Sequence, residues 1–161
     1  MKIGILMGSD SDVPVMKKAA EMLKEFHADF EMVIASAHRT PDAVVEFVHR
    51  LEAEGAAAFI AGAGAAAHLP GVVASLTALP VIGVPLNATS LKGMDALLAI
   101  VQMPSGMPVA TVAIDGAKNA ALLAIQICAT AEPELRERYQ EYRAREAARV
   151  MAKNEALQAT L

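Results

Sequence analysis

Five short apolar runs alternate along this chain with segments of helical character. The runs lie near residues 2–7, 30–35, 57–62, 80–84 and 109–114, and each is followed by a helix or by a loop and a helix. Strands separated by helices of about 10 to 15 residues form a parallel sheet with helices on both faces. We therefore expect an α/β fold, built as a three-layer αβα sandwich around five parallel strands.

Stripes of apolar residues at helical spacing predict two of the helices. The first stripe contains Val13, Met16, Ala20 and Leu23, and the second contains Val44, Val45, Val48 and Leu51. Pro14 and Pro41 each stand in a first helical turn, where proline is tolerated. This alternation favours the flavodoxin-like strand order 2-1-3-4-5.

Charge is concentrated at the C-terminal end of the chain. Of the 14 basic and 18 acidic residues, 12 lie within residues 132–161. Several form i,i+4 pairs in the favourable orientation: Glu132 with Arg136, Glu134 with Arg138, and Glu141 with Arg145. We expect a core domain over residues 1–131. An added C-terminal helix over residues 132–161 would pack on the same domain or on a neighbouring subunit.

Composition narrows the class of protein. A chain of 161 residues fits one domain, and its net charge of −4, without a basic cluster beside aromatic residues, argues against a nucleic-acid partner. Cys128 is the single cysteine and lies in an apolar run, so we expect a buried thiol and no disulfide. The chain starts with strand-like residues and shows no leader pattern, from which we expect a cytoplasmic protein.

The segment from Gly55 to Leu91 contains no Asp, Glu, Lys or Arg. Glycines and prolines interrupt it below the roughly 20 apolar residues that a membrane-spanning helix needs, so we expect no membrane span. Two helical segments, near 67–78 and 91–102, are nearly apolar on all sides. Because such helices are buried all round, we expect them to face neighbouring copies in a closed homo-oligomer.

The loop after the first strand is Gly8-Ser9-Asp10-Ser11-Asp12. Its backbone N–H groups, its hydroxyls and the helix start that follows suit a phosphate group. Because an aspartate repels phosphate, we expect Asp12 to accept hydrogen bonds from ribose hydroxyls and Asp10 to face solvent. The same residues would also serve as an ordinary helix N-cap.

The loops after the second and third strands carry two imidazoles. Ser36, His38 and Arg39 precede the helix start Thr40-Pro41, and Arg39 offers the bidentate donors that suit phosphate. The third loop, residues 61–71, contains glycines that let a ligand approach the backbone, and it ends near His68. Because parallel strands end at one edge of the sheet, these loops should converge. Alternatively, His38 and Arg39 have no functional role and only hydrogen-bond the backbone or face solvent.

Two other interpretations of these loops are weaker. Gly62, Gly64 and Ala67 satisfy G-x-G-x-x-A, but a dinucleotide site requires an acidic residue about 20 positions later, and the segment to Leu91 has none. A metal site at His38 and His68 lacks a third ligand at a recognisable spacing.

Four motifs together resemble the family of N5-carboxyaminoimidazole ribonucleotide mutases of purine biosynthesis. They are G-S-D-S-D at 8–12, S-A-H-R-T-P at 36–41, A-G-A-G-A-A-A-H-L-P-G at 61–71, and G-M-D-A-L-L-A-I-V-Q-M-P-S-G-M-P-V-A-T at 93–111. The resemblance covers about residues 1–131. It implies a flavodoxin-like catalytic domain, a homo-octamer with sites at subunit boundaries, and neither cofactor nor metal.

The resemblance also implies a reaction and a set of roles. A carboxylate moves from the exocyclic nitrogen of the ribonucleotide substrate to ring carbon 4, through release and recapture of CO2. His38 would carry the single proton as general acid and base. Ser9, Asp12 and Arg39 would bind the ribose phosphate, Ser11, Ser36 and Gly64 would line the pocket, and His68 matches a second family histidine that contacts the substrate.

Two departures from the family pattern bear on the pocket. Ala65 stands where the family has a glycine, and an alanine there strains the loop if the position needs a positive φ. The segment at 113–121 is about two residues shorter than in many members. Two other functions fit the same motifs: a carboxylase that uses free CO2, and a catalytically silent nucleotide-phosphate binding module.

Overall fold

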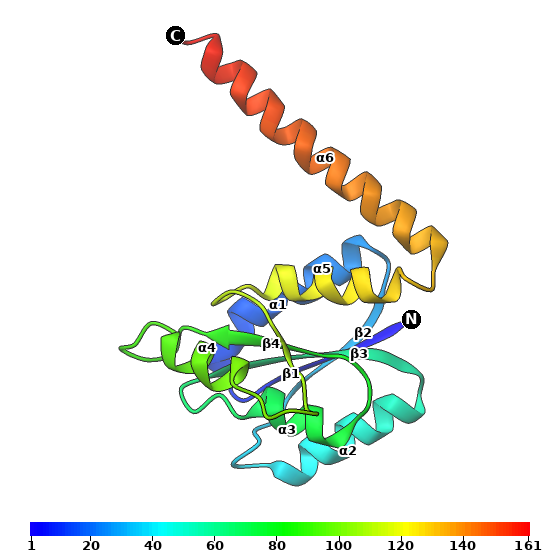
Figure 1. Ribbon diagram of the computed structural model, residues 1–161, viewed down its shortest axis with the longest axis vertical. Helices are drawn as coiled ribbons and strands as arrows, with labels where there is room; N and C mark the ends of the chain where they lie inside the picture. Colours follow the sequence, from blue (N-terminus) through cyan, green and yellow to red (C-terminus); the bar gives the residue numbers. More distant parts are fainter. The chain divides into compact units, whose positions relative to one another are not determined.

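A five-stranded parallel sheet forms the centre of the fold in the computed structural model, which describes residues 1–161 (Figure 1). The strands are β1 (Lys2–Met7), β2 (Asp29–Ile34), β3 (Ala56–Gly64), β4 (Val81–Leu86) and β5 (Ala110–Thr111). They lie in the order β2-β1-β3-β4-β5, and every neighbouring pair is parallel. The expected fold class and strand order are therefore confirmed.

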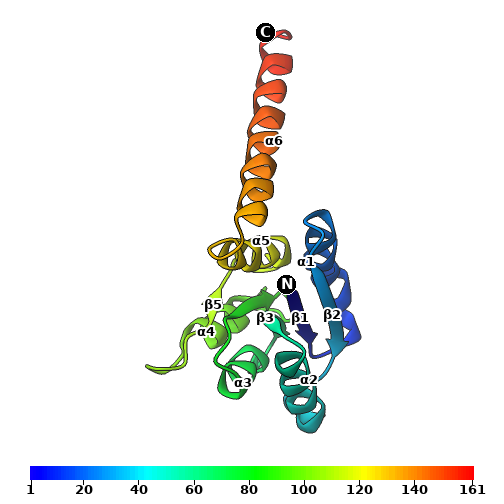
Figure 2. The same cartoon turned by 90° about the vertical axis from the view of Figure 1, so that its right-hand side faces the viewer.

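Helices cover both faces of this sheet. The helices of the chain are α1 (Val13–Glu25), α2 (Pro41–Ala53), α3 (Leu69–Leu76), α4 (Met94–Val101), α5 (Ala117–Cys128) and α6 (Pro133–Gln158), and a short 3₁₀ turn, η1, lies at Asp10–Asp12. In Figure 2, α2 and α3 lie on one face and α1 lies on the other. The chain forms two compact units, Met1–Ala124 and Ile125–Leu161.

The main core lies between the sheet and the helices α2, α3 and α4. Phe59 and Leu6 point into it from the strands, and Val48, Val73 and Ile100 point into it from the helices. All six residues of β4 are buried, as expected for a parallel strand that is covered on both faces. On the opposite face, Met16 of α1 packs directly against Gly62 of β3, where a Cβ atom would collide with its sulfur.

Some boundaries differ from the expected ones. β3 runs two residues further, to Gly64, because its last residues pair with Pro85 and Leu86 of β4. The predicted third loop therefore begins inside a strand, and the glycines of the G-x-G-x-x-A pattern serve strand packing. The expected fifth strand, 109–114, is reduced to two residues, because β5 is an edge strand that pairs only with β4.

The second compact unit contains the end of α5 and the charged helix α6. Arg136 donates hydrogen bonds to the carbonyl oxygens of Ala129 (3.1 Å) and Thr130 (3.0 Å), which stabilises the last turn before α6. Cys128 is buried as expected, and burial raises the pKa of its thiol. No helix in the chain combines the length and the apolar character needed to cross a membrane.

Candidate functional site

A hollow of about 350 Å³ opens at the carboxyl ends of the strands β1, β2 and β3. We call it the site hollow. All eight residues selected from the sequence line it: Ser9, Ser11, Asp12, Ser36, His38, Arg39, Gly64 and His68. The three loops thus converge as expected from a parallel sheet.

The first loop is held by a capping box. Ser9 accepts a hydrogen bond from the backbone N–H of Ser11 (3.3 Å), and the Asp12 carboxylate accepts one from the backbone N–H of Ser9 (3.1 Å). Asp12 is only 8% exposed, and this burial raises the pKa of its carboxyl group. Asp10 is exposed as expected, and its Oδ1 accepts hydrogen bonds within the loop.

The second loop is tied together around Ser36, which is almost fully buried. Thr40 is the N-cap residue of α2, but its hydroxyl accepts a hydrogen bond from the Ser36 backbone N–H (2.8 Å) and makes no capping bond to the helix. The Ser36 hydroxyl in turn accepts a hydrogen bond from the Arg39 backbone N–H (3.2 Å). These two bonds hold the second loop together just before α2.

Arg39 joins the first and second loops. Its Nη2 donates to the carbonyl oxygen of Gly8 at 2.7 Å, and its Nε lies 3.4 Å from the Ser36 hydroxyl. These contacts hold the guanidinium beside the serines of the first loop. A cation at this place, next to hydroxyls and backbone N–H groups, is suited to bind a phosphate.

His38 and His68 form a direct pair in the site hollow. Nε2 of His38 lies 2.7 Å from Nδ1 of His68, and the rings meet edge to face with centroids 4.9 Å apart. At this distance a single proton must lie between the two nitrogens, so one ring donates and the other accepts. Both side chains are exposed to the hollow. The pair provides a group that can give and take one proton.

The third loop contains two alanines in left-handed conformations. Ala65 has a φ of +52° and Ala67 a φ of +40°. The condition for strain at Ala65 is therefore met, because a side chain disfavours this region of backbone space. Gly64 has no room for a side chain, because a Cβ there would lie 2.5 Å from the Cβ of Ala88. Ala88, on the loop after β4, also lines the hollow and was missed from the sequence, where nothing distinguishes it.

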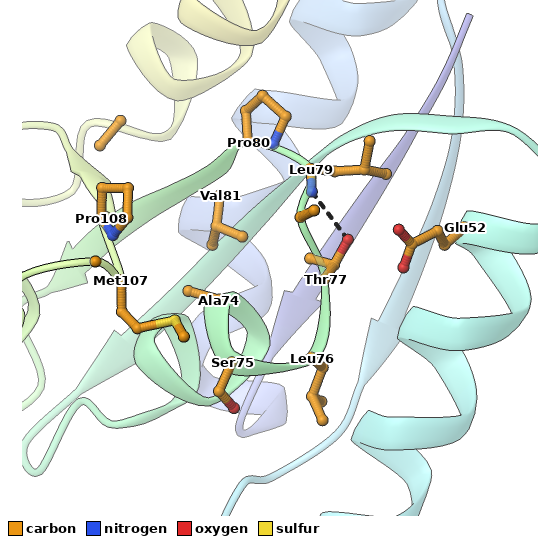
Figure 3. A pocket seen from close by; sticks show the side chains of 13 residues that line it. Glu52, Ala74, Ser75, Leu76, Thr77, Leu79, Pro80, Val81, Met107 and Pro108 are labelled. Atoms are coloured by element: carbon orange, nitrogen blue, oxygen red, sulfur yellow. Dashed lines mark hydrogen bonds between the residues drawn. The ribbon is translucent and has the colours of Figure 1, made fainter.

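A larger hollow lies elsewhere in the structure. Figure 3 shows its lining, which encloses about 770 Å³ near the start of β4 at Val81. Glu52, Ser75 and Thr77 are its polar side chains, and the Thr77 hydroxyl accepts a hydrogen bond from the Leu79 backbone N–H (3.1 Å). This hollow lies at the amino end of β4, whereas the loops described above follow the carboxyl ends of the strands. It therefore takes no part in the chemistry of those loops.

The site hollow combines an acid–base pair with an anion-binding cation. Arg39 and the serines suit one end of a phosphorylated ligand, and the imidazoles suit proton transfer at another part of it. No group of three or more His, Cys, Asp or Glu side chains is placed to hold a metal ion.

Comparison with known proteins identifies similar chains. The AIR carboxylase family model matches residues 2–149. N5-carboxyaminoimidazole ribonucleotide mutase of Pyrococcus abyssi is 58% identical over 142 residues, which cover 88% of this chain and 82% of that protein. The mutase of Thermotoga maritima is 54% identical over 98% of this chain and 92% of its own length. The crystal structure of Treponema denticola PurE has a TM-score of 0.84 at 31% identity and covers 97% of this chain and 98% of that one.

Proposed function

Because this chain belongs to the AIR carboxylase family, we infer that it is an isomerase of purine biosynthesis, with the activity named for its relatives, N5-carboxyaminoimidazole ribonucleotide mutase. It moves a carboxylate from the exocyclic nitrogen of the substrate to carbon 4 of the imidazole ring. The product is 4-carboxy-5-aminoimidazole ribonucleotide.

His38 carries the one proton that the reaction needs. When the nitrogen carboxylate leaves as CO2, the electron pair of the broken bond stays on nitrogen, which takes a proton from His38. Carbon 4 then attacks the CO2, a carbon–carbon bond forms, and the proton on carbon 4 returns to His38. Proton donor and acceptor are thus the same imidazole, and no proton is gained or lost overall.

The other site residues bind and orient the ribonucleotide. Arg39 and Ser9 hold the phosphate, and Asp12 accepts hydrogen bonds from the ribose. Ser11, Ser36 and Gly64 shape the wall of the hollow. His68 lines the same hollow and contacts the substrate, and through the 2.7 Å contact between its Nδ1 and Nε2 of His38 it sets which nitrogen of His38 carries the proton.

The observation that carries this proposal is the His38–His68 pair, set in one hollow with Arg39. The test is to give the purified protein each substrate in turn: the N-carboxylated ribonucleotide without added bicarbonate, and the uncarboxylated ribonucleotide with CO2. We expect rapid conversion of the first. Conversion of only the second would identify a carboxylase that uses free CO2 instead.

Replacing His38 separates catalysis from binding. His38→Asn keeps a polar side chain of similar size but cannot exchange the proton, so we expect turnover to fall by about 10² to 10⁴. Binding of the product, measured by calorimetry, should change little. A wild-type protein that binds ribonucleotide and converts none of it would indicate a binding module.

We also propose a homo-octamer in the cytoplasm that works without a cofactor. Two features support self-association: the apolar side chains of Leu91, Met94, Leu98 and Val101, each about half exposed or more, and the apolar hollow near the start of β4. A further support is that His38 and His68 are exposed in the single chain, whereas CO2 is retained only in a covered pocket. The division into a catalytic domain, 1–131, and a helical extension, 132–161, stays a prediction.

A further inference from the structure

A second hollow opens beside the site hollow, and we call it the side recess. It encloses about 180 Å³, and its polar lining consists of Ser11, Asp12, Asn87 and Asp115. Ser11, Asp12 and Ala88 line both hollows. The buried Asp12 carboxylate therefore lies at the boundary between the two spaces.

Asp115 is held in the side recess by the turn between β5 and α5. Its backbone N–H donates to the carbonyl oxygen of Pro85 (2.8 Å), and its Oδ1 accepts a hydrogen bond from the backbone N–H of Asn87 (3.0 Å). These bonds tie the turn to the loop after β4. Oδ2 of Asp115 takes part in neither of these bonds.

The shortened segment at 113–121 contains this turn. Asp115 adopts a φ of +57°, and the N–H of Gly116 donates to the carbonyl oxygen of Ala113 at 2.9 Å. A Cβ at position 116 would lie 2.7 Å from that same oxygen, so the turn has no room for a larger residue there. Asp115 is thus the one side chain that this tight turn presents to the recess.

The chemistry of the side recess selects its ligand group. Two carboxylates repel a phosphate, which is attracted to Arg39 in the site hollow. No third metal-binding side chain joins the two aspartates. Carboxylate and amide oxygens are acceptors, so a neutral group that carries hydroxyl donors fits the recess best. In a ribonucleotide the sugar that carries such hydroxyls lies between the phosphate and the ring.

We propose that Asn87 and Asp115, together with Asp12, form the subsite that binds the ribose hydroxyls of the substrate. This proposal rests on the proposed function, because that function supplies the ribonucleotide. With the phosphate at Arg39 and the imidazole ring at His38, the sugar lies beside Asp12, and its hydroxyls reach the recess that Asp12 borders. Asn87 and Asp115 are then specificity-determining residues for ribose.

The test compares ligands with and without each hydroxyl. Calorimetry measures the Kd of 4-carboxy-5-aminoimidazole ribonucleotide and of its 2′-deoxy and 3′-deoxy forms. For the wild type we expect removal of at least one hydroxyl to weaken binding by about tenfold, the effect of one hydrogen bond to a charged group. In Asp115→Ala the same removal should cost about twofold or less, because the acceptor is already missing.

Asn87→Ala is the second variant, because it removes a side chain from the recess while the backbone N–H that bonds Asp115 remains. Glu46→Gln is the matched control: it removes one negative charge from an exposed position of α2 that lines neither hollow. The control should retain the full hydroxyl dependence of the wild type.

Equal losses on hydroxyl removal in the wild type, Asp115→Ala and Asn87→Ala would overturn this proposal. That result is distinct from failure of the proposed function, which would appear as a wild-type protein that binds the ribonucleotide but does not convert it. Thermal unfolding of each variant verifies that the turn remains folded.

Discussion

At the scale of single residues, we expect the two histidines to have different roles: His38 exchanges the proton, and His68 positions it. His68 touches His38 through one nitrogen, at 2.7 Å, and we expect its main effect to be on the proton that His38 carries. His68→Phe should lower kcat by about tenfold or more and leave KM within about threefold of the wild type. His68→Asn, which restores a hydrogen-bonding group, should recover part of the loss.

The measurement is steady-state turnover across pH. If His68 positions the proton, the pH dependence of kcat should change in His68→Phe and return toward the wild type in His68→Asn. Equal losses of activity in both variants, with an unchanged pH profile, would show a packing role only.

Ala65 offers a second test at this scale. Its φ of +52° costs an alanine more than a glycine, whereas a glycine loses more backbone entropy on folding. We expect Ala65→Gly to raise the free energy of unfolding by about 0.5 to 1 kcal/mol, measured by urea denaturation. Ala66→Gly is the control: Ala66 is a neighbour without a positive φ, and its replacement should destabilise the protein slightly. A loss of stability in both variants would contradict the strain at Ala65.

At the scale of elements, a network of four charges joins β1, β2 and α2. Lys2 bonds Glu54 and lies 3.4 Å from Glu31, while Arg50 bonds both Glu31 and Glu54. The hydrogen bond from Arg50 lowers the pKa of Glu31, and the one from Lys2 lowers the pKa of Glu54. The bond with Glu54 raises the pKa of Lys2. The network therefore holds the start of the sheet against α2 while all four groups are charged.

The pKa directions give the pH range of this effect. A carboxyl group whose pKa is lowered by folding stabilises the protein above its unfolded value, 4.5, and loses that effect as the pH falls. Lys2, whose pKa is raised, contributes below 10.5 and loses its effect at higher pH. We expect Glu54→Gln to lower the urea midpoint near neutral pH, and the difference to shrink once the pH falls below 4.5 and to vanish below the lowered pKa of Glu54. Because the groups are exposed, high salt should reduce it too. A difference that persists in acid would contradict this account.

The elements also show what could be predicted from the sequence. β1 and β2 were located to within one residue, whereas the end of β4 was missed by two. The ends of β3 and β5 could not be found from the sequence, because pairing with β4 decides both. The three site loops followed from the parallel topology. The sequence did not predict that Ala88, Asn87 and Asp115 line the two hollows. Their positions depend on contacts between loops that are far apart in the sequence.

At the scale of the whole molecule, the exposed face of α4 tests the proposed assembly. Leu98 is 51% exposed in the single chain, so a charge there should be tolerated by a monomer. We expect the wild type to scatter light as an octamer of the 16.8 kDa chain, and Leu98→Glu to give smaller, folded species. Ala43→Glu, at an exposed position of α2, is the control and should keep the wild-type mass. A stable wild-type monomer at micromolar concentration would contradict the octamer.

The close approach of Gly64 and Ala88 has a consequence for how this family can vary. A Cβ at position 64 would lie 2.5 Å from the Cβ of Ala88. The space between the two positions therefore has room for the side chain of only one of them. A substitution that is harmful at one of these positions alone can therefore be harmless when the other position changes as well. A library randomised at both codons should yield active clones with a small residue at one of the positions whenever the other is enlarged, and the exchange of alanine and glycine should rank among the survivors.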